Sequence, residues 1–350
     1  MSQFKWTYAP FTLKLRRAFT IARGTRREAT NVLVRIERDD IVGYGEAAPN
    51  KRYDETPQKV MGFLDQLDQE ILDDIPNPEV LSNRLAKQNP AIRSARCAVE
   101  TAYLDWYGKK ENRSVFRLMG GRTSLGSISS YTLGMAEPQT ITDKLEEAES
   151  YPLLKVKLGG SRDRETIKLI RQHSKKPIFV DVNEGWKNLD VAKSQIDFLA
   201  DKNVILLEQP MPADHNWEEL CELKSYSPIP ICADEGFVGD ESITKIKKAY
   251  DCINIKIMKT GSLIKSLELI RQAKREQLKV LIGCMIESSI ADSASAMLTL
   301  WSDFADIDGR LLIEEDPFEG VTLTDDYHLK LKEIPGIGIR RSDKWENFLD

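Results

Sequence analysis

Eight short apolar runs alternate with charged, helix-like stretches from about residue 126 onward, and this alternation constrains the fold more than any other feature. Each run has the length of a buried strand, and the stretch between two runs has room for a helix. Alternating strands and helices form a parallel sheet, and eight repeats predict closure into a (β/α)8, TIM-like barrel. The runs are SISSYTLG, LLKVKLG, PIFVDVN, VILLEQP, PICADEG, CINIKIM, VLIGCMIE and DFADIDG.

The first part of the chain has a different pattern. Its opening residues read as a meander of strands rich in β-branched side chains, and amphipathic helices follow near 55–72, 79–88 and 91–109. The C-terminal stretch is rich in turns and is expected to return to this unit. The sequence therefore predicts an α+β capping domain built from residues 1–125 and the tail 315–350, with the barrel catalytic domain over 126–314.

Composition narrows the class of partner. The 350 residues have a formal net charge of −5, which provides no basic face for nucleic acid, so we expect a small-molecule partner. The five cysteines are scattered and form no CxxC pair, which favours reduced thiols and a cytoplasmic location. We predict no signal peptide and no membrane segment. The sequence leaves the oligomeric state open, a homo-oligomer included.

Five charged residues stand at the ends of successive predicted strands: Lys157, Asp181, Glu208, Asp234 and Lys256. Parallel strands end at one mouth of a barrel, so these side chains should meet there. Three close carboxylates repel one another unless they are protonated or bridged by a cation. All-oxygen ligands with no nearby histidine or cysteine ligand favour Mg²⁺, with Mn²⁺ as an alternative. The competing interpretation is that these acids cap helices or pair with arginines.

The two outer lysines lie on opposite sides of the predicted barrel. Lys157 belongs to the second strand and Lys256 to the sixth, and strands four apart face each other across an eight-stranded ring. Lys155 projects from the same face as Lys157 and, with the cation, would help Lys157 to act as a base. Two opposed amines beside a metal-held carboxylate suit racemisation or epimerisation. The competing interpretation is a pair of solvated rim charges.

The segments KVKLGG, DVNEGW, LLEQP, ADE and NIK together resemble the muconate-lactonising subgroup of the enolase superfamily. The resemblance covers nearly the whole chain, including an N-terminal capping domain. It implies a lysine base and an ene-diolate that Mg²⁺ stabilises.

A finer resemblance lies in FADIDG. Asp306 and Asp308 are similar to the Asp-x-Asp pair of dipeptide epimerases, which binds the substrate's α-ammonium group. The eighth strand lies opposite the fourth, so a dipeptide of roughly 7 Å could stretch from this pair to the metal. The stereocentre of its C-terminal residue would then fall between the lysines. The alternative is a helix cap or turn pair before Gly309. The best-known activity in this family interconverts L-Ala-D-Glu and L-Ala-L-Glu from murein peptides.

Capping-domain loops of this family close over the substrate, and here they would be residues 20–27 and 50–55. Their arginines are candidates to bind a glutamate side chain: Arg23, Arg26, Arg27 and Arg52. Gly24 stands where some Ala-Glu epimerases have an arginine, which leaves hydrophobic or broad dipeptide substrates open. Two further residues are predicted to support the site, Asn183 by steadying a ligand or its water and Glu235 by orienting Lys256.

Other reactions on the same site are muconate cycloisomerisation and o-succinylbenzoate synthesis, whose substrates have no α-ammonium group for the aspartate pair. An acid-sugar dehydratase would normally use a histidine base, and none of His173, His215 and His328 lies at the end of the sixth or seventh strand. A non-catalytic metabolite-binding barrel would have lost a ligand or a lysine, whereas all five positions are present.

Overall fold

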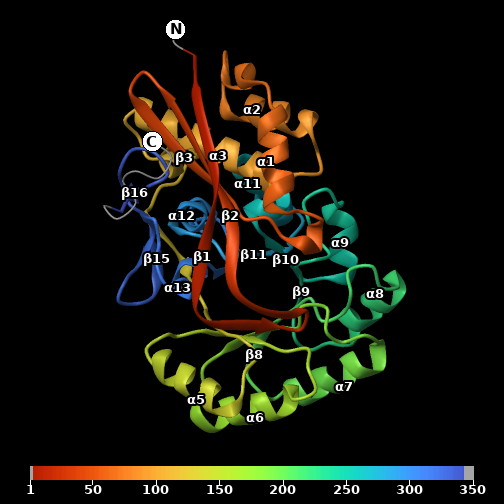
Figure 1. Cartoon of the computed structure of the whole chain (residues 1–350). Coiled ribbons are helices and arrows are strands. Elements are labelled where there is room, and N and C mark those ends of the chain that lie inside the picture. Colours follow the sequence, from red (N-terminus) through yellow and green to blue (C-terminus); the bar gives the residue numbers. More distant parts are fainter. Residues whose placement is uncertain (1–2, 343–350) are drawn as a thin grey trace.

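The structure is a computed structural model that describes residues 3–342, so the last eight residues of the predicted tail lie outside the described residues. Figure 1 shows long N-terminal strands and helices, in red and orange, joined to a ring of shorter strands and helices in green and blue. The largest hydrophobic core contains residues of both parts, such as Leu13 and Ile282. A second core, which includes Val60 and Trp106, lies within the N-terminal part.

The N-terminal sheet is an antiparallel meander of β1 (Lys5–Ile21), β2 (Gly24–Arg38) and β3 (Ile41–Ala47). Asp39 and Asp40 form the tight turn between β2 and β3, with φ angles of 53° and 59°. Aspartate tolerates this left-handed conformation because its short side chain can hydrogen-bond locally. The predicted strand meander is therefore present.

Helix α3 packs on β3 at very short range. A Cβ atom on Gly43 would lie 2.1 Å from the backbone oxygen of Ala102, and one on Gly45 would lie 1.9 Å from that of Ala98. Only glycine permits this approach of helix and strand. The helical elements of this part are η1 (Lys51–Tyr53), α1 (Pro57–Gln66), η2 (Gln69–Leu72), α2 (Pro78–Gln88), α3 (Arg93–Lys110) and α4 (Val115–Leu118).

All eight predicted apolar runs contribute strands to one parallel sheet, in the order β12-β11-β10-β9-β8-β7-β6-β5. A parallel bridge between Ser129 and Ala305 brings the two edges together, so the predicted barrel is confirmed as a nearly closed one. Its strands are β5 (Tyr131–Leu133), β6 (Leu154–Lys157), β7 (Ile178–Asp181), β8 (Val204–Glu208), β9 (Ile231–Ala233), β10 (Cys252–Ile255), β11 (Lys279–Gly283) and β12 (Phe304–Asp306).

Helices connect the barrel strands, and many begin at a polar residue whose side chain accepts a backbone hydrogen bond of the first turn, as Asn188 and Ser242 do. The last helix, which follows β12, is only four residues long. The helices are α5 (Pro138–Glu147), α6 (Asp163–His173), α7 (Leu189–Leu199), α8 (Trp217–Tyr226), α9 (Ile243–Ala249), α10 (Ile257–Thr260), α11 (Leu263–Arg275), α12 (Ser289–Leu298) and α13 (Gly309–Leu312).

The C-terminal tail contacts both parts of the molecule. With the N-terminal part, the backbone N–H of Val115 donates to Gly336, and Arg341 donates to the hydroxyl of Tyr44. With the barrel part, the backbone N–H of Ser289 donates to Asp316 at 2.9 Å. Its short strands pair as β13 (Phe318–Glu319) with β16 (Arg340–Arg341), and as β14 (Thr322–Leu323) with β15 (His328–Lys330) and β4 (Leu125–Ile128). The division of the chain at residues 125 and 314 stays a prediction.

The hairpin of β1 and β2 reaches from the N-terminal part to the barrel, where its turn lies near the ends of the green strands (Figure 1). The backbone N–H of Met135 donates to Thr20 in this hairpin at 2.9 Å. The capping part therefore covers the barrel mouth at which the predicted site lies. Within residues 3–342 we find no helix with the length and apolar character needed to cross a membrane.

Candidate active site

Three carboxylates gather at the carboxyl ends of three neighbouring strands. Asp181 ends β7, Glu208 ends β8 and Asp234 directly follows β9. Each residue is at most 1% exposed, and one oxygen of each carboxylate lies within 4.8 Å of the others. The structure therefore brings together the three predicted metal ligands, on the third, fourth and fifth barrel strands.

Crowding of these acids changes their ionisation. Burial and the nearby Asp181 raise the pKa of Glu208 to about 7. Burial also acts to raise the pKa of Asp181, but the ammonium groups of Lys157 and Lys155 outweigh it and hold that pKa at about 2. The buried, all-oxygen donor set is costly to ionise without a further positive charge, and therefore fits a hard divalent cation.

The two predicted bases each contact one carboxylate of this cluster. Lys157 Nζ, at the end of β6, lies 2.6 Å from Asp181 Oδ2, and Lys256 Nζ, just after β10, lies 2.8 Å from Asp234 Oδ2. Burial acts to lower the pKa of Lys256, but Asp234 and other carboxylates hold it well above the ordinary value. Because β6 and β10 are four strands apart in the ring, the two lysines approach the cluster from opposite sides.

Lys155 is a buried counter-ion, with 1% of its surface exposed. Its ammonium nitrogen lies 2.6 Å from Asp306, 2.7 Å from Glu208 and 3.2 Å from Asp181. Lys155 and Lys157 therefore lie on the same face of β6, as predicted. Its amine joins β6 to carboxylates on β7, β8 and β12.

Asp306 and Asp308 both line the cavity above the cluster. Asp306 accepts hydrogen bonds from Lys155 at 2.6 Å and from the Ser130 hydroxyl at 2.7 Å. Asp308 accepts one from the backbone N–H of Thr132 at 3.0 Å, and burial followed by Asp306 raises its pKa to about 6. The side chain of Asp308 makes no capping hydrogen bond to α13. Asp308 stands at the N-cap position of α13, but its carboxylate faces the cavity and Thr132 and does not cap the helix.

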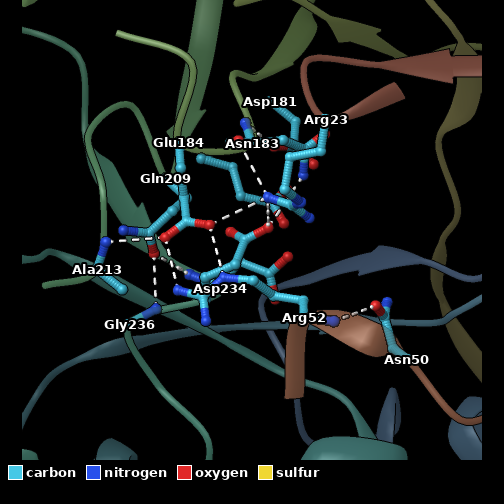
Figure 2. Close-up of polar contacts among 12 residues, drawn as sticks. Arg23, Asn50, Arg52, Asp181, Asn183, Glu184, Gln209, Ala213, Asp234 and Gly236 are labelled. Atoms are coloured by element: carbon cyan, nitrogen blue, oxygen red, sulfur yellow. Dashed lines mark hydrogen bonds and ion pairs between the residues drawn. The ribbon is translucent and has the colours of Figure 1, made fainter. Parts of the chain in front are cut away.

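Two of the predicted loop arginines converge on Glu184 (Figure 2). Arg52 donates two hydrogen bonds of 2.8 Å to this carboxylate, and Arg23 lies 3.2 Å from it. Arg23 also lies 2.6 Å from Glu235, whose side chain accepts a hydrogen bond from Asn183 at 3.3 Å. Both guanidinium groups are therefore already paired within the protein.

Arg26 also lines the cavity, but it has no such partner. Among residues 3–342 no carboxylate forms an ion pair with it, and burial together with the neighbouring Arg23 lowers its pKa. Of the three predicted arginines that line the cavity, Arg23, Arg26 and Arg52, Arg26 is thus the one without an ion pair among the described residues.

Sequence reasoning missed several residues that hold the cluster. Lys259 is fully buried, and its Nζ lies 2.6 Å from Asp234 Oδ1. The side-chain oxygen of Gln209 accepts the backbone N–H of Asp234 at 2.8 Å. Gln209 could have been found as the residue that directly follows Glu208. The only sequence feature that pointed to Lys259 is weaker: it lies about one helical turn after Lys256.

The cavity above these residues has a volume of about 440 Å³, within the range of small-molecule sites. Its walls come from the turn of the β1–β2 hairpin, the segment around η1 and the ends of the barrel strands. A site of this kind encloses one small substrate and can exclude water from its reacting atoms.

Comparison with known families defines the class of protein. Residues 140–345 match the family model described as enolase C-terminal domain-like, and residues 7–120 match the mandelate racemase / muconate lactonizing enzyme N-terminal domain. The chain therefore belongs to the mandelate racemase / muconate lactonizing enzyme family of the enolase superfamily. The predicted superfamily is confirmed. The predicted isomerase class is confirmed by curated relatives, which are epimerases.

Individual relatives are similar over almost their full length. The L-Ala-D/L-Glu epimerase of Bacteroides thetaiotaomicron is 34% identical, with 97% of this chain and 88% of that protein covered. A dipeptide epimerase of Enterococcus faecalis, solved with Mg and L-Leu-L-Tyr, has a TM-score of 0.87 at 28% identity and covers 97% of this chain and 100% of that one. An N-succinyl Arg/Lys racemase of Bacillus cereus has a TM-score of 0.90 at 26% identity, with coverage of 99% and 98%.

Proposed function

We propose that this protein is a dipeptide epimerase that inverts the α-carbon of the C-terminal residue and interconverts L-Ala-D-Glu and L-Ala-L-Glu. One observation carries the proposal: Lys157 and Lys256 flank one carboxylate cluster from opposite sides, and Asp306 and Asp308 line the same cavity. Similarity to proteins named as epimerases of dipeptides supports this assignment.

Asp181, Glu208 and Asp234 would hold one divalent cation, Mg²⁺ or alternatively Mn²⁺. When bound, the ion supplies positive charge that stabilises the negative charge developing on the substrate carboxylate as the α-proton leaves. Asp234 would contact both this ion and Lys256, so cation binding would weaken the ion pair that keeps the Lys256 amine protonated.

The side chains of the protein then have two separate roles, proton transfer and substrate binding. One lysine removes the α-proton from one face, and the opposed lysine delivers a proton to the other face. Asp306 and Asp308 bind the ammonium group at the dipeptide's N-terminus and so set the reacting carbon between the lysines. Neither muconate nor the o-succinylbenzoate precursor carries a positive group for these two acids.

Arg26 is the proposed partner of the glutamate side chain, because it lines the cavity and forms no ion pair with any carboxylate of residues 3–342. We expect Arg26→Gln to lower kcat/KM for L-Ala-L-Glu about 10- to 100-fold, since a hydrogen bond to a charged group is lost. The value for L-Ala-L-Gln should change little. Arg27→Gln is the matched control, because the neighbouring Arg27 does not line the cavity. Equal losses for both dipeptides would contradict the assignment.

The metal-free protein should lose stability as pH rises. The folded-state pKa of Glu208 is raised from an ordinary 4.5 to about 7. Its protonated form therefore contributes stability that is fully present below pH 4.5 and is lost as pH rises through about 7. Because Mg²⁺ compensates the ionised form, it should raise the melting temperature more at pH 8 than at pH 5. An equal increase at both pH values, or the same pH dependence in Glu208→Gln, would contradict this prediction.

The function itself is tested with a dipeptide panel in D₂O containing Mg²⁺, with exchange of the C-terminal α-proton followed by NMR. We expect exchange with L-Ala-L-Glu and L-Ala-D-Glu. N-succinyl-L-Lys should exchange poorly, because Asp306 and Asp308 would repel its acyl carboxylate. Absence of exchange with every dipeptide would refute the proposal. Faster exchange of the succinyl compound than of the dipeptides would indicate an N-acylamino acid racemase instead.

A further inference from the structure

Glu184 lies in the barrel loop that follows Asp181 at the end of β7, and its backbone is held in an uncommon conformation. Asn183 and Glu184 have φ angles of 47° and 68°, the left-handed region that glutamate rarely adopts. The Asn183 N–H donates to Asp181 at 3.0 Å, and the Glu184 N–H donates to the backbone oxygen of Gln209 at 2.9 Å. Such conformations persist where surrounding contacts fix them and cluster at functional sites.

The Glu184 carboxylate is the meeting point of two separate loops (Figure 2). Its Oε1 accepts from Arg52 at 2.8 Å and from the Ala213 N–H at 2.9 Å, and its Oε2 accepts from Arg52 at 2.8 Å and from Arg23 at 3.2 Å. Arg23 belongs to the hairpin turn between β1 and β2, whereas Arg52 belongs to η1. Both loops form walls of the cavity.

Burial makes this junction stronger than an ordinary surface contact. The Glu184 side chain is 8% exposed, and each arginine side chain is 33% exposed. A bidentate arginine–carboxylate pair fixes direction as well as distance, and screening by solvent is reduced when one partner is buried. The two capping loops are thus bound to the barrel loop that directly follows Asp181.

We infer that Glu184 is a positioning residue that holds both capping loops over the cavity before substrate arrives. Without it, each substrate molecule would have to order residues 20–27 and 50–55 as it binds. Fastening the loops beforehand removes that entropic cost from binding, while the proton-transfer groups lie elsewhere. Glu184 therefore acts on substrate affinity.

The first test measures the loops directly and needs no substrate. Glu184→Gln keeps the acceptor for Ala213 but removes the charge that both arginines share. Hydrogen exchange in residues 50–55 should become about 10-fold faster or more, because Arg52 loses the charge that it binds. Exchange in residues 20–27 should also become faster but by a smaller factor, because Arg23 keeps its 2.6 Å ion pair with Glu235. Glu147→Gln is the matched control, because Glu147 pairs with Arg17 of the same hairpin in a more exposed ion pair. Unchanged exchange in either loop of Glu184→Gln would overturn the inference.

The second test separates positioning from chemistry and rests on the proposed function. Glu184→Gln should raise KM for L-Ala-L-Glu about 10- to 100-fold and change kcat less than about threefold. Arg52→Gln should raise KM similarly, and the double variant should be no worse than either single one, because all three changes break one junction. A fall in kcat that matches the fall in kcat/KM would overturn the role. If no dipeptide reacts, only the proposed function fails, and the exchange experiment still decides the role of Glu184.

Discussion

Lys157→Ala and Lys256→Ala should each abolish epimerisation, with turnover reduced about 10²- to 10⁴-fold or more, because each removes the acid or base on one face of the substrate. The two variants should differ in what they retain. Each keeps the lysine on the other face, so each should still exchange the α-proton of one stereoisomer only. Proton NMR of L-Ala-L-Glu and L-Ala-D-Glu, incubated separately in D₂O, measures this.

A matched control is Lys51→Ala. Lys51 also lines the cavity, but it is exposed and belongs to η1 rather than to a barrel strand. Its loss should leave exchange of both isomers in place. Unchanged turnover in Lys157→Ala or in Lys256→Ala, or retention of exchange with the same isomer by both variants, would contradict the two-base arrangement.

Lys155→Met should lower the free energy of unfolding by about 3–5 kcal/mol at pH 7, because it leaves buried carboxylates without their shared counter-ion. The ammonium of Lys155 lies within 3.2 Å of three of them, on Asp306, Glu208 and Asp181. Urea unfolding in the presence of EDTA measures the effect on the metal-free protein. Epimerase activity should also be lost, since the same carboxylates then repel one another around the site.

The pH dependence of this loss follows from the sign of the pKa shifts. Without Lys155 the folded-state pKa values of its three partners rise, so their protonated forms stabilise the folded protein at low pH and that stability is lost as pH rises. The deficit of Lys155→Met should therefore be smaller at pH 5 than at pH 8. Lys157→Met is the control, because Lys157 has a single carboxylate partner within 4 Å among the described residues. A smaller loss for Lys155→Met than for this control would contradict the account.

The barrel and the position of the carboxylate cluster could be predicted from the sequence because both depend on the regular length of the strand–helix unit. One strand and one helix occupy a nearly constant number of residues, so charges that recur at that interval must leave the same end of a parallel sheet. Asp181, Glu208 and Asp234 meet for this reason. Asp306 ends a strand of the same sheet, but it was predicted from the resemblance of FADIDG to the Asp-x-Asp pair of dipeptide epimerases and not from this interval.

The partners of the loop arginines could not be predicted in that way. Arg52 and Glu184 are 132 residues apart, and their contact depends on how the η1 segment docks on the barrel. The spacing of charged residues along the chain gives no information on contacts between different parts of a fold. Arg23, Arg26 and Arg52 line the cavity, whereas Arg27 does not. The sequence pattern gave no means to tell Arg23 and Arg52, which form ion pairs, from Arg26, which forms none among the described residues. Pairing is decided by side-chain geometry, which a linear pattern does not contain.

The position of the deuterium tests the central claim most directly. L-Ala-L-Glu is incubated with the enzyme and Mg²⁺ in D₂O, and both isomers are analysed by mass spectrometry and NMR before a tenth of the substrate has reacted. Two opposed lysines predict that the new L-Ala-D-Glu carries solvent deuterium at its α-carbon, while the remaining L-Ala-L-Glu is largely unlabelled. Product that keeps the substrate's own α-proton, or no product and no exchange, would contradict two-base epimerisation by Lys157 and Lys256.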